Sequence, residues 1–116
     1  MSDISIYHNP RCSKSRQTLA LLKQKGFKAN IIEYLKTPPD IETLTTIIQQ
    51  LGISPRALLR KGEAMYKELN LKDESFSDQQ LIQAMCDNPK LIERPIVIYN
   101  GKAKLGRPPE SALEIL

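Results

Sequence analysis

The chain has 116 residues, 41% of them hydrophobic, and a formal net charge of +4. A chain of this length can bury a hydrophobic core without help from disulfides or metals, so we expect a single domain over residues 1–116. Aromatic residues make up only 5%, and the basic residues are dispersed along the chain, which argues against a nucleic-acid surface built on base stacking. The surplus positive charge better suits a pocket for an anion.

The first residues, Met1 to Tyr7, lack the basic and apolar regions of a signal peptide. No apolar run approaches the roughly 18 residues of a membrane span. We therefore expect a cytoplasmic protein with no membrane association. Cysteines in a reducing compartment stay as thiols unless a disulfide is part of a redox reaction. Cys12 and Cys86 therefore suggest a chemical role and not a structural disulfide.

The N-terminal residues predict a strand, a tight loop and a helix. Residues 4–8 are rich in β-formers and are followed by Pro10, which ends the strand at His8. A helical pattern begins at Cys12 or Ser13, and Gly26 supplies its C-terminal stop.

Residues 30–35 predict a second strand, and a strand-helix-strand of this length forms a right-handed parallel unit. The middle of the chain then predicts helices. They span residues 37–52 with Thr37 as the cap, residues 54–60 opened by Ser54-Pro55, and residues 77–88 opened by a capping box of Ser77 and Gln80.

The C-terminal part predicts a β-hairpin over residues 96–105, because Asn100-Gly101 tolerates the positive φ angles of a type I′ turn. A last short helix is expected over residues 108–115. The order βαβ, helices, ββα indicates an α/β fold of the thioredoxin-like class, with a four-stranded mixed sheet and a helical insertion.

Cys12 is the predicted nucleophile. It lies where the first strand gives way to the first helix, and a helix N-terminus favours the thiolate form of a cysteine. The flanking residues Arg11, Lys14 and Arg16 add positive charge. Pro10, Arg11 and Lys14 make a poor hydrophobic core. The alternative is an inert, buried cysteine.

The spacing Cys12-x-x-Ser15 lacks the second thiol of a dithiol enzyme. An external thiol such as glutathione is the simplest group to resolve an adduct at Cys12. Cys86 is the alternative, but Leu81, Ile82 and Met85 around it suggest a helix face packed on the core, and we expect Cys86 to be structural.

Residues 8–16, His-Asn-Pro-Arg-Cys-Ser-Lys-Ser-Arg, closely resemble the active-site loop of the glutaredoxin-coupled arsenate reductases. Further segments resemble the family in family order: residues 34–39, 52–60, 91–97 and 106–109. The resemblance covers essentially the whole chain. It implies a thioredoxin-like oxidoreductase that reduces arsenate to arsenite through a Cys12 thiol-arsenate adduct, with glutathione as co-substrate and glutaredoxin as partner.

The resemblance further implies that Arg60, Arg94 and Arg107 surround the oxyanion. Guanidinium groups suit this task because they donate paired, charge-assisted hydrogen bonds to oxyanions. The family also implies that His8 helps to keep the cysteine ionised, although this residue could equally be a strand-end histidine bonded to the backbone.

Ser15 is a candidate hydrogen-bond donor to the thiolate or the oxyanion, because it lies one helical turn from Cys12. Thioredoxin-like folds resemble one another in keeping a cis proline beside the active cysteine, and Pro95 stands at that place. A cis bond there would hold Arg94 in position.

No metal and no bound cofactor are expected, because His8 and the two cysteines lack ligand spacing. We expect a monomer. Two other functions stay open: a glutathione-linked thiol oxidoreductase with another natural substrate, and a regulator resembling the Spx type, which binds RNA polymerase. Spx-type proteins commonly carry a Cys-x-x-Cys switch, which this chain lacks.

Overall fold

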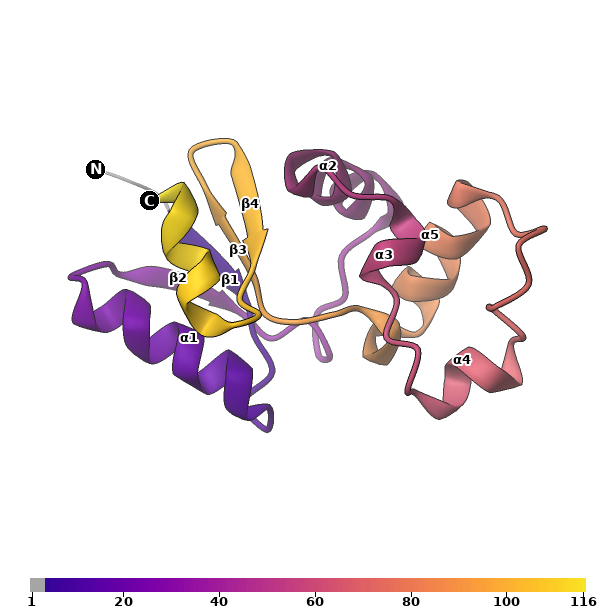
Figure 1. Ribbon diagram of the computed structural model, residues 1–116, viewed down its shortest axis with the longest axis horizontal. Helices are drawn as coiled ribbons and strands as arrows, with labels where there is room; N and C mark the ends of the chain where they lie inside the picture. The colour runs from indigo at the N-terminus through magenta and orange to yellow at the C-terminus, as the bar shows by residue number, and fades with distance from the viewer. Residues whose placement is uncertain (1–3) are drawn as a thin grey trace. The chain divides into compact units, whose positions relative to one another are not determined.

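The computed structural model describes residues 4–116, which divide into two compact units (Figure 1). The sheet unit comprises the described residues up to Thr37 together with Arg94–Leu116, and the helical unit comprises Pro38–Glu93. The expectation of one domain over residues 1–116 stays a prediction. Within the described part of the chain, no helix is both long enough and apolar enough to cross a bilayer.

The sheet unit contains a four-stranded mixed sheet of order β2-β1-β3-β4. Its strands are β1 (Ile4–Tyr7), β2 (Ala29–Ile32), β3 (Ile96–Tyr99) and β4 (Lys102–Leu105). Strand β1 is parallel to β2 and antiparallel to β3, which is antiparallel to β4. The predicted thioredoxin-like arrangement of strands is confirmed.

One face of this sheet is covered by α1 (Ser13–Gln24) and the 3₁₀ helix η2 (Pro109–Ile115), which contact each other (Figure 1). Burial of apolar side chains between these layers is the main stabilising contribution. The buried cluster joins strands and helices and consists of Ile4, Ile6, Leu22, Val97 and Ala112.

The hairpin between β3 and β4 turns at the predicted residues. Asn100 and Gly101 have φ angles of 53° and 78°, as a type I′ turn requires at both central positions. The predicted C-terminal helix is present as η2, but it has 3₁₀ geometry.

The second strand is shorter than predicted. It ends at Ile32, and the Glu33 carbonyl then accepts hydrogen bonds from the N–H groups of Lys36 and Thr37. The turn therefore takes up residues 33–35, which the β-forming residue types had predicted to continue the strand.

The helix predicted from Thr37 begins later. Helix α2 (Ile41–Leu51) is capped by Asp40, whose Oδ1 accepts from Thr43 N at 2.7 Å. The prediction of Thr37 as cap was wrong because Pro39 disfavours helical backbone at Pro38. The helix ends at Gly52, as predicted, with a φ of 70°.

The helical unit also contains α3 (Pro55–Leu58), α4 (Ala64–Glu68), α5 (Asp78–Asp87) and the 3₁₀ helix η1 (Pro89–Leu91). Helix α5 contacts α2, α3 and η1. Helix α3 is shorter than predicted because Leu59 pairs with Ile92 as an isolated β-bridge. Helix α4 was not predicted.

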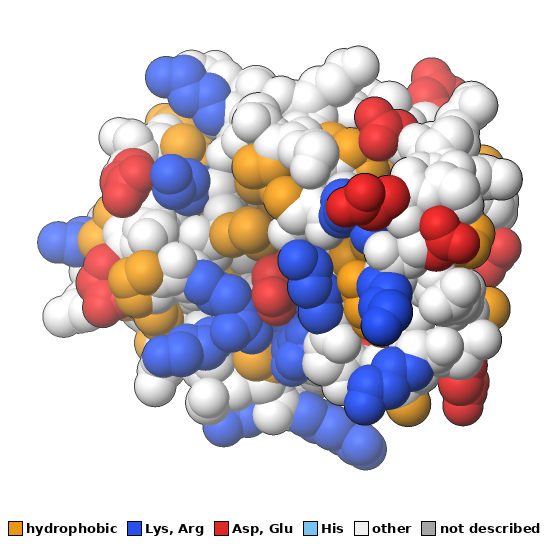
Figure 2. All heavy atoms as spheres, turned by 45° about the vertical axis from the view of Figure 1, so that its right-hand side comes forward, with side chains coloured by type: hydrophobic (Ala, Val, Ile, Leu, Met, Phe, Trp, Pro, Cys, Tyr) orange, Lys and Arg blue, Asp and Glu red, His pale blue; other side chains and the backbone are white. Residues whose placement is uncertain are grey.

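Charges of both signs lie on the face drawn in Figure 2, where Asp and Glu side chains stand among Lys and Arg. The net charge of +4 is therefore not gathered into a patch of one sign on this face. The expectation that the protein does not bind nucleic acid stays a prediction.

Replacing Ser77 by alanine tests the capping box of α5. Ser77 Oγ accepts from Gln80 N at 3.1 Å, and Gln80 Oε1 accepts from Ser77 N at 2.8 Å. Ser77→Ala should lower the free energy of unfolding by about 1 kcal/mol, measured by urea denaturation. The control is Ser75→Ala, because Ser75 lies in the loop before α5, bonds to Asp73 and takes no part in the cap. Equal losses in both variants would contradict the capping role.

Candidate active site

The register of the sheet brings three distant segments to one end of the sheet unit. Tyr7 pairs with Ile96, and Ile96 pairs with Leu105. The residues that follow β1, precede β3 and follow β4 therefore emerge side by side. They carry three of the sequence motifs: residues 8–16, 94–95 and 106–109.

Cys12 occupies the N-cap position of α1, and the residue is 8% exposed. Its backbone is extended, with φ −94° and ψ 123°, and its carbonyl accepts the first helical hydrogen bond from Arg16 N at 3.0 Å. The first N–H groups of a helix lack partners within the helix, so this end attracts negative charge. The predicted position of the cysteine is confirmed.

A compact loop presents the cysteine. The N–H of Cys12 donates to Asn9 O at 3.0 Å, and Asn9 Oδ1 accepts from Arg11 N at 3.0 Å. Arg16 Nη1 donates to Pro10 O at 2.9 Å. The loop is therefore closed by bonds between its own residues and the first turns of α1.

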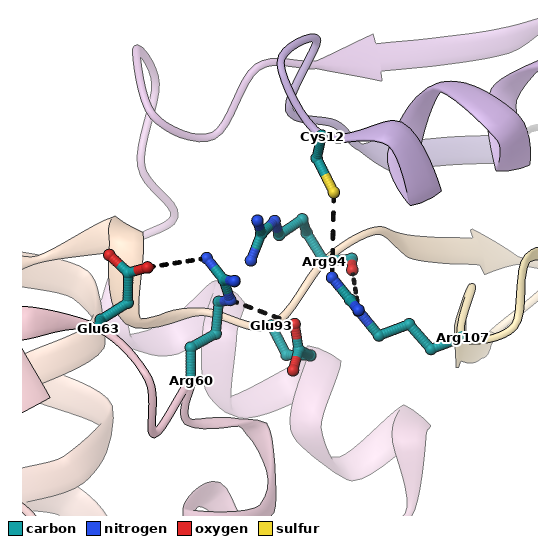
Figure 3. A network of polar contacts seen from close by, with 6 residues as sticks. All are labelled: Cys12, Arg60, Glu63, Glu93, Arg94 and Arg107. Atoms are coloured by element: carbon teal, nitrogen blue, oxygen red, sulfur yellow. Dashed lines mark hydrogen bonds and ion pairs between the residues drawn. The ribbon is translucent and has the colours of Figure 1, made fainter.

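Arg107 places its guanidinium beside the sulfur of Cys12. Its Nη2 lies 3.9 Å from Cys12 Sγ, and its Nε donates to Arg94 O at 2.8 Å (Figure 3). The carbonyl bond orients the planar guanidinium, and the positive charge attracts an anion at or beside the sulfur.

Arg94 and Pro95 lie directly across from Arg107. The Arg94-Pro95 peptide bond is cis, as predicted, and the Arg107-Pro108 bond is also cis. Gly106 N donates to Pro95 O at 3.0 Å, which continues the pairing of β3 with β4 beyond the strands. The side chain of Arg94 is partly buried, with its Nε and Nη1 atoms shielded from solvent.

His8 and Ser15 form a buried pair. His8 Nδ1 lies 2.6 Å from Ser15 Oγ, which also accepts the N–H of Asn9 at 3.0 Å. The two residues are 6% and 0% exposed. Ser15 is thus bonded toward the end of β1, and its predicted role as a donor to the oxyanion stays a prediction.

Burial lowers the pKa of His8 below its ordinary value of 6.5. Glu33 opposes this shift, while Arg16 and Lys23 reinforce it. The ring is therefore neutral at pH 7 and offers one nitrogen as an acceptor. A neutral imidazole contributes no positive charge toward the cysteine, so any influence of His8 on Cys12 acts through Ser15 and the loop. The proposed help in ionising the cysteine stays a prediction.

Arg60 belongs to the helical unit. Its backbone N–H donates to Leu91 O at 2.8 Å. Its guanidinium is held between two carboxylates, with Nη1 3.0 Å from Glu63 Oε2 and Nε 3.4 Å from Glu93 Oε1 (Figure 3). These carboxylates offset much of its charge. The assignment of Arg60 to the oxyanion stays a prediction.

Cys86, in α5, is partly exposed and unpaired by any disulfide. Burial raises the pKa of the Cys86 thiol, and the nearby Asp87 and Asp40 carboxylates raise it further. The thiol is therefore protonated at neutral pH and a weak nucleophile.

Sequence reasoning missed several partners. The two carboxylates at Arg60 and the carbonyl that orients Arg107 were not foreseen. The spacing of Glu63, three residues after Arg60, is a local signal, because the two residues close one turn between α3 and α4 in which Glu63 N donates to Arg60 O at 3.3 Å. The other contacts join residues far apart in sequence and leave no local signal. Among residues 4–116, no cluster of three His, Cys, Asp or Glu side chains suits a metal ion.

The mixed sheet and the cysteine at the start of its first helix define a protein of the thioredoxin-like class. Residues 7–115 match the ArsC family, and the chain belongs to this family.

The chain is also similar to individual proteins. It is 59% identical to the uncharacterized protein YfgD of Escherichia coli over 97% of this chain and 96% of the relative. It is 46% identical over the full length of both chains to a Neisseria meningitidis protein named arsenate reductase. A solved structure described as arsenate reductase from Vibrio cholerae matches with a TM-score of 0.97 and 56% identity over 98% of each chain.

Titration of the single histidine tests the buried His8–Ser15 pair. We expect an imidazole NMR midpoint below 6.5 in the folded protein and an ordinary midpoint in urea. As the pH falls below about 6.5, the unfolded chain binds the proton first, so the free energy of unfolding should decrease. His8→Gln, which cannot titrate, should reduce that pH dependence. A folded midpoint at or above 6.5 would rule out the desolvated, neutral ring.

Proposed function

We propose that this protein is an arsenate reductase that uses Cys12 as its nucleophile and takes its electrons from glutathione, with glutaredoxin as the partner. The observation that carries the proposal is the Arg107 guanidinium 3.9 Å from Cys12 Sγ at the N-terminus of α1. A nucleophilic sulfur beside a cation and a helix N-terminus suits an electrophile that carries negative charge. Relatives named arsenate reductase support arsenate as that substrate.

In the proposed reaction the Cys12 thiolate attacks arsenic, an As–S bond forms and an arsenate oxygen leaves as water. A glutathione thiolate then forms a disulfide with the Cys12 sulfur as the As–S bond breaks. Arsenic keeps the bonding electron pair and departs as arsenite, so the two thiols lose the two electrons that reduce As(V) to As(III). Glutaredoxin reduces the mixed disulfide and returns Cys12 as a thiol.

The proposed task of the protein is to place charge where the oxyanion needs it. Arg107 is oriented before substrate arrives, because its Nε is already bonded to the Arg94 carbonyl. Its guanidinium lies 3.9 Å from the Cys12 sulfur, so its positive charge is already placed where the oxyanion would bind. Arg94 and Arg60 are the further arginines that the family resemblance assigns to the oxyanion.

Glutathione and glutaredoxin imply a reducing compartment, so the proposal includes a cytoplasmic location.

Replacing each cysteine in turn tests the single-thiol mechanism. Cys12→Ser should abolish arsenite formation in an assay with arsenate, glutathione and glutaredoxin, because the serine hydroxyl is not ionised at neutral pH. Cys86→Ser should keep most of the activity, because the raised pKa of Cys86 leaves it protonated. Equal losses in both variants would replace this mechanism with an internal disulfide relay.

Replacing Arg107 by lysine separates oxyanion binding from thiol activation. Lysine keeps the charge but loses the planar fork, and each charge-assisted hydrogen bond lost costs about 1.5–3 kcal/mol. The kcat/KM for arsenate should therefore fall by about one to two decades, while alkylation of Cys12 by neutral iodoacetamide should change little. Arg60→Lys and Arg94→Lys test the other two arginines in the same way. Unchanged arsenate kinetics in all three variants would remove the anion pocket.

The same preparation distinguishes the other two functions considered. Reduction of a small mixed disulfide by glutathione without arsenate turnover would indicate a general thiol oxidoreductase. Retention of RNA polymerase in a pull-down, with neither activity, would indicate a regulator.

A further inference from the structure

We propose that Gly106 and Thr18 are positioning residues for Arg107: their close approach holds the guanidinium of Arg107 at the sulfur of Cys12. This inference rests on the proposed function for its consequence in arsenate reduction. The contact itself is a property of the sheet unit and can be tested without arsenate.

The backbone of Gly106 packs where no side chain fits. A Cβ at this position would lie 2.5 Å from Thr18 Oγ1, 3.0 Å from Thr18 Cγ2 and 2.8 Å from Pro95 Cγ. Real Cβ atoms essentially never come within 3.0 Å of such neighbours. Gly62, by contrast, has open space around the same position. The glycine at 106 is therefore required by packing.

The side chain of Thr18, which a Cβ at position 106 would meet, is held in place. It is 0% exposed in the middle of α1, and its Oγ1 donates to Lys14 O at 2.8 Å, one turn back along the helix. That bond and the surrounding burial leave the side chain little freedom to turn away. A larger residue at 106 would displace the chain after β4, because α1 cannot yield.

Such a displacement reaches Arg107 directly. Gly106 N donates to Pro95 O, and the next residue donates from its Nε to Arg94 O. Both bonds join the chain after β4 to the chain before β3. Moving Gly106 away from α1 therefore moves Arg107 away from Cys12, which caps the same helix.

Alkylation of Cys12 measures this placement. In a Cys86→Ser background only one thiol reacts, and the ratio of its rates with anionic iodoacetate and neutral iodoacetamide reports positive charge at the sulfur. Gly106→Ala should lower the ratio by about three- to tenfold, the size expected when one nearby cation is displaced in a partly solvated site. Arg107→Gln gives the lower limit, and Gly62→Ala should leave the ratio unchanged.

A rescue experiment separates positioning from a general loss of structure. Thr18→Ala removes two of the three atoms that a Cβ at 106 would meet and leaves the Pro95 contact, so the Thr18→Ala/Gly106→Ala double variant should recover part of the ratio. An unchanged ratio in folded Gly106→Ala would overturn the proposal, and so would a reduced ratio that the double variant does not recover.

A second variant keeps the test decisive if Gly106→Ala does not fold. Thr18→Val replaces Oγ1 with a bulkier methyl group and presses on Gly106 from the helix side. It should lower the ratio partially, and an unchanged ratio would overturn the proposal.

With arsenate, Gly106→Ala should raise KM more than it lowers kcat. If the unsubstituted protein does not reduce arsenate, the proposed function fails while the alkylation ratios still decide the positioning role.

Discussion

The antiparallel pairing of β3 with β4 is the constraint on which the active-site arrangement depends. It continues past the strands through the 3.0 Å hydrogen bond from Gly106 N to Pro95 O. Because β3 also pairs with β1, the same register fixes the end of β1, from which the loop leads to Cys12. An arginine and a cysteine separated by most of the chain therefore meet at one end of a small sheet.

The polar groups near the cysteine divide into two sets with different tasks. The loop bonds, together with the buried His8–Ser15 pair, hold the backbone that presents the sulfur. Arg107 supplies charge and donors toward the sulfur, and the Arg94 carbonyl orients it. A neutral, desolvated histidine fits the first task, since an imidazolium would be costly at a site that is 6% exposed.

In the helical unit, ion pairs fix the side chain of Arg60. Arg60 is fixed by Glu63 and Glu93, and its backbone is paired to the segment that ends at Glu93. The two carboxylates offset part of the positive charge of the Arg60 guanidinium and fix the orientation of its plane.

The sequence by itself determined the local elements: the strand before Pro10, the helix from Ser13, the capping box at Ser77 and the turn at Asn100-Gly101. Each depends on residues within a few positions of one another, so periodicity and turn chemistry suffice. It also marked Cys12 through its place at a helix start. Only the tertiary structure decided which atoms surround the sulfur, because the contacts of Arg107 with Cys12 and of Gly106 with Thr18 join residues about 90 positions apart. Such contacts follow from strand register and helix packing, which no local pattern encodes.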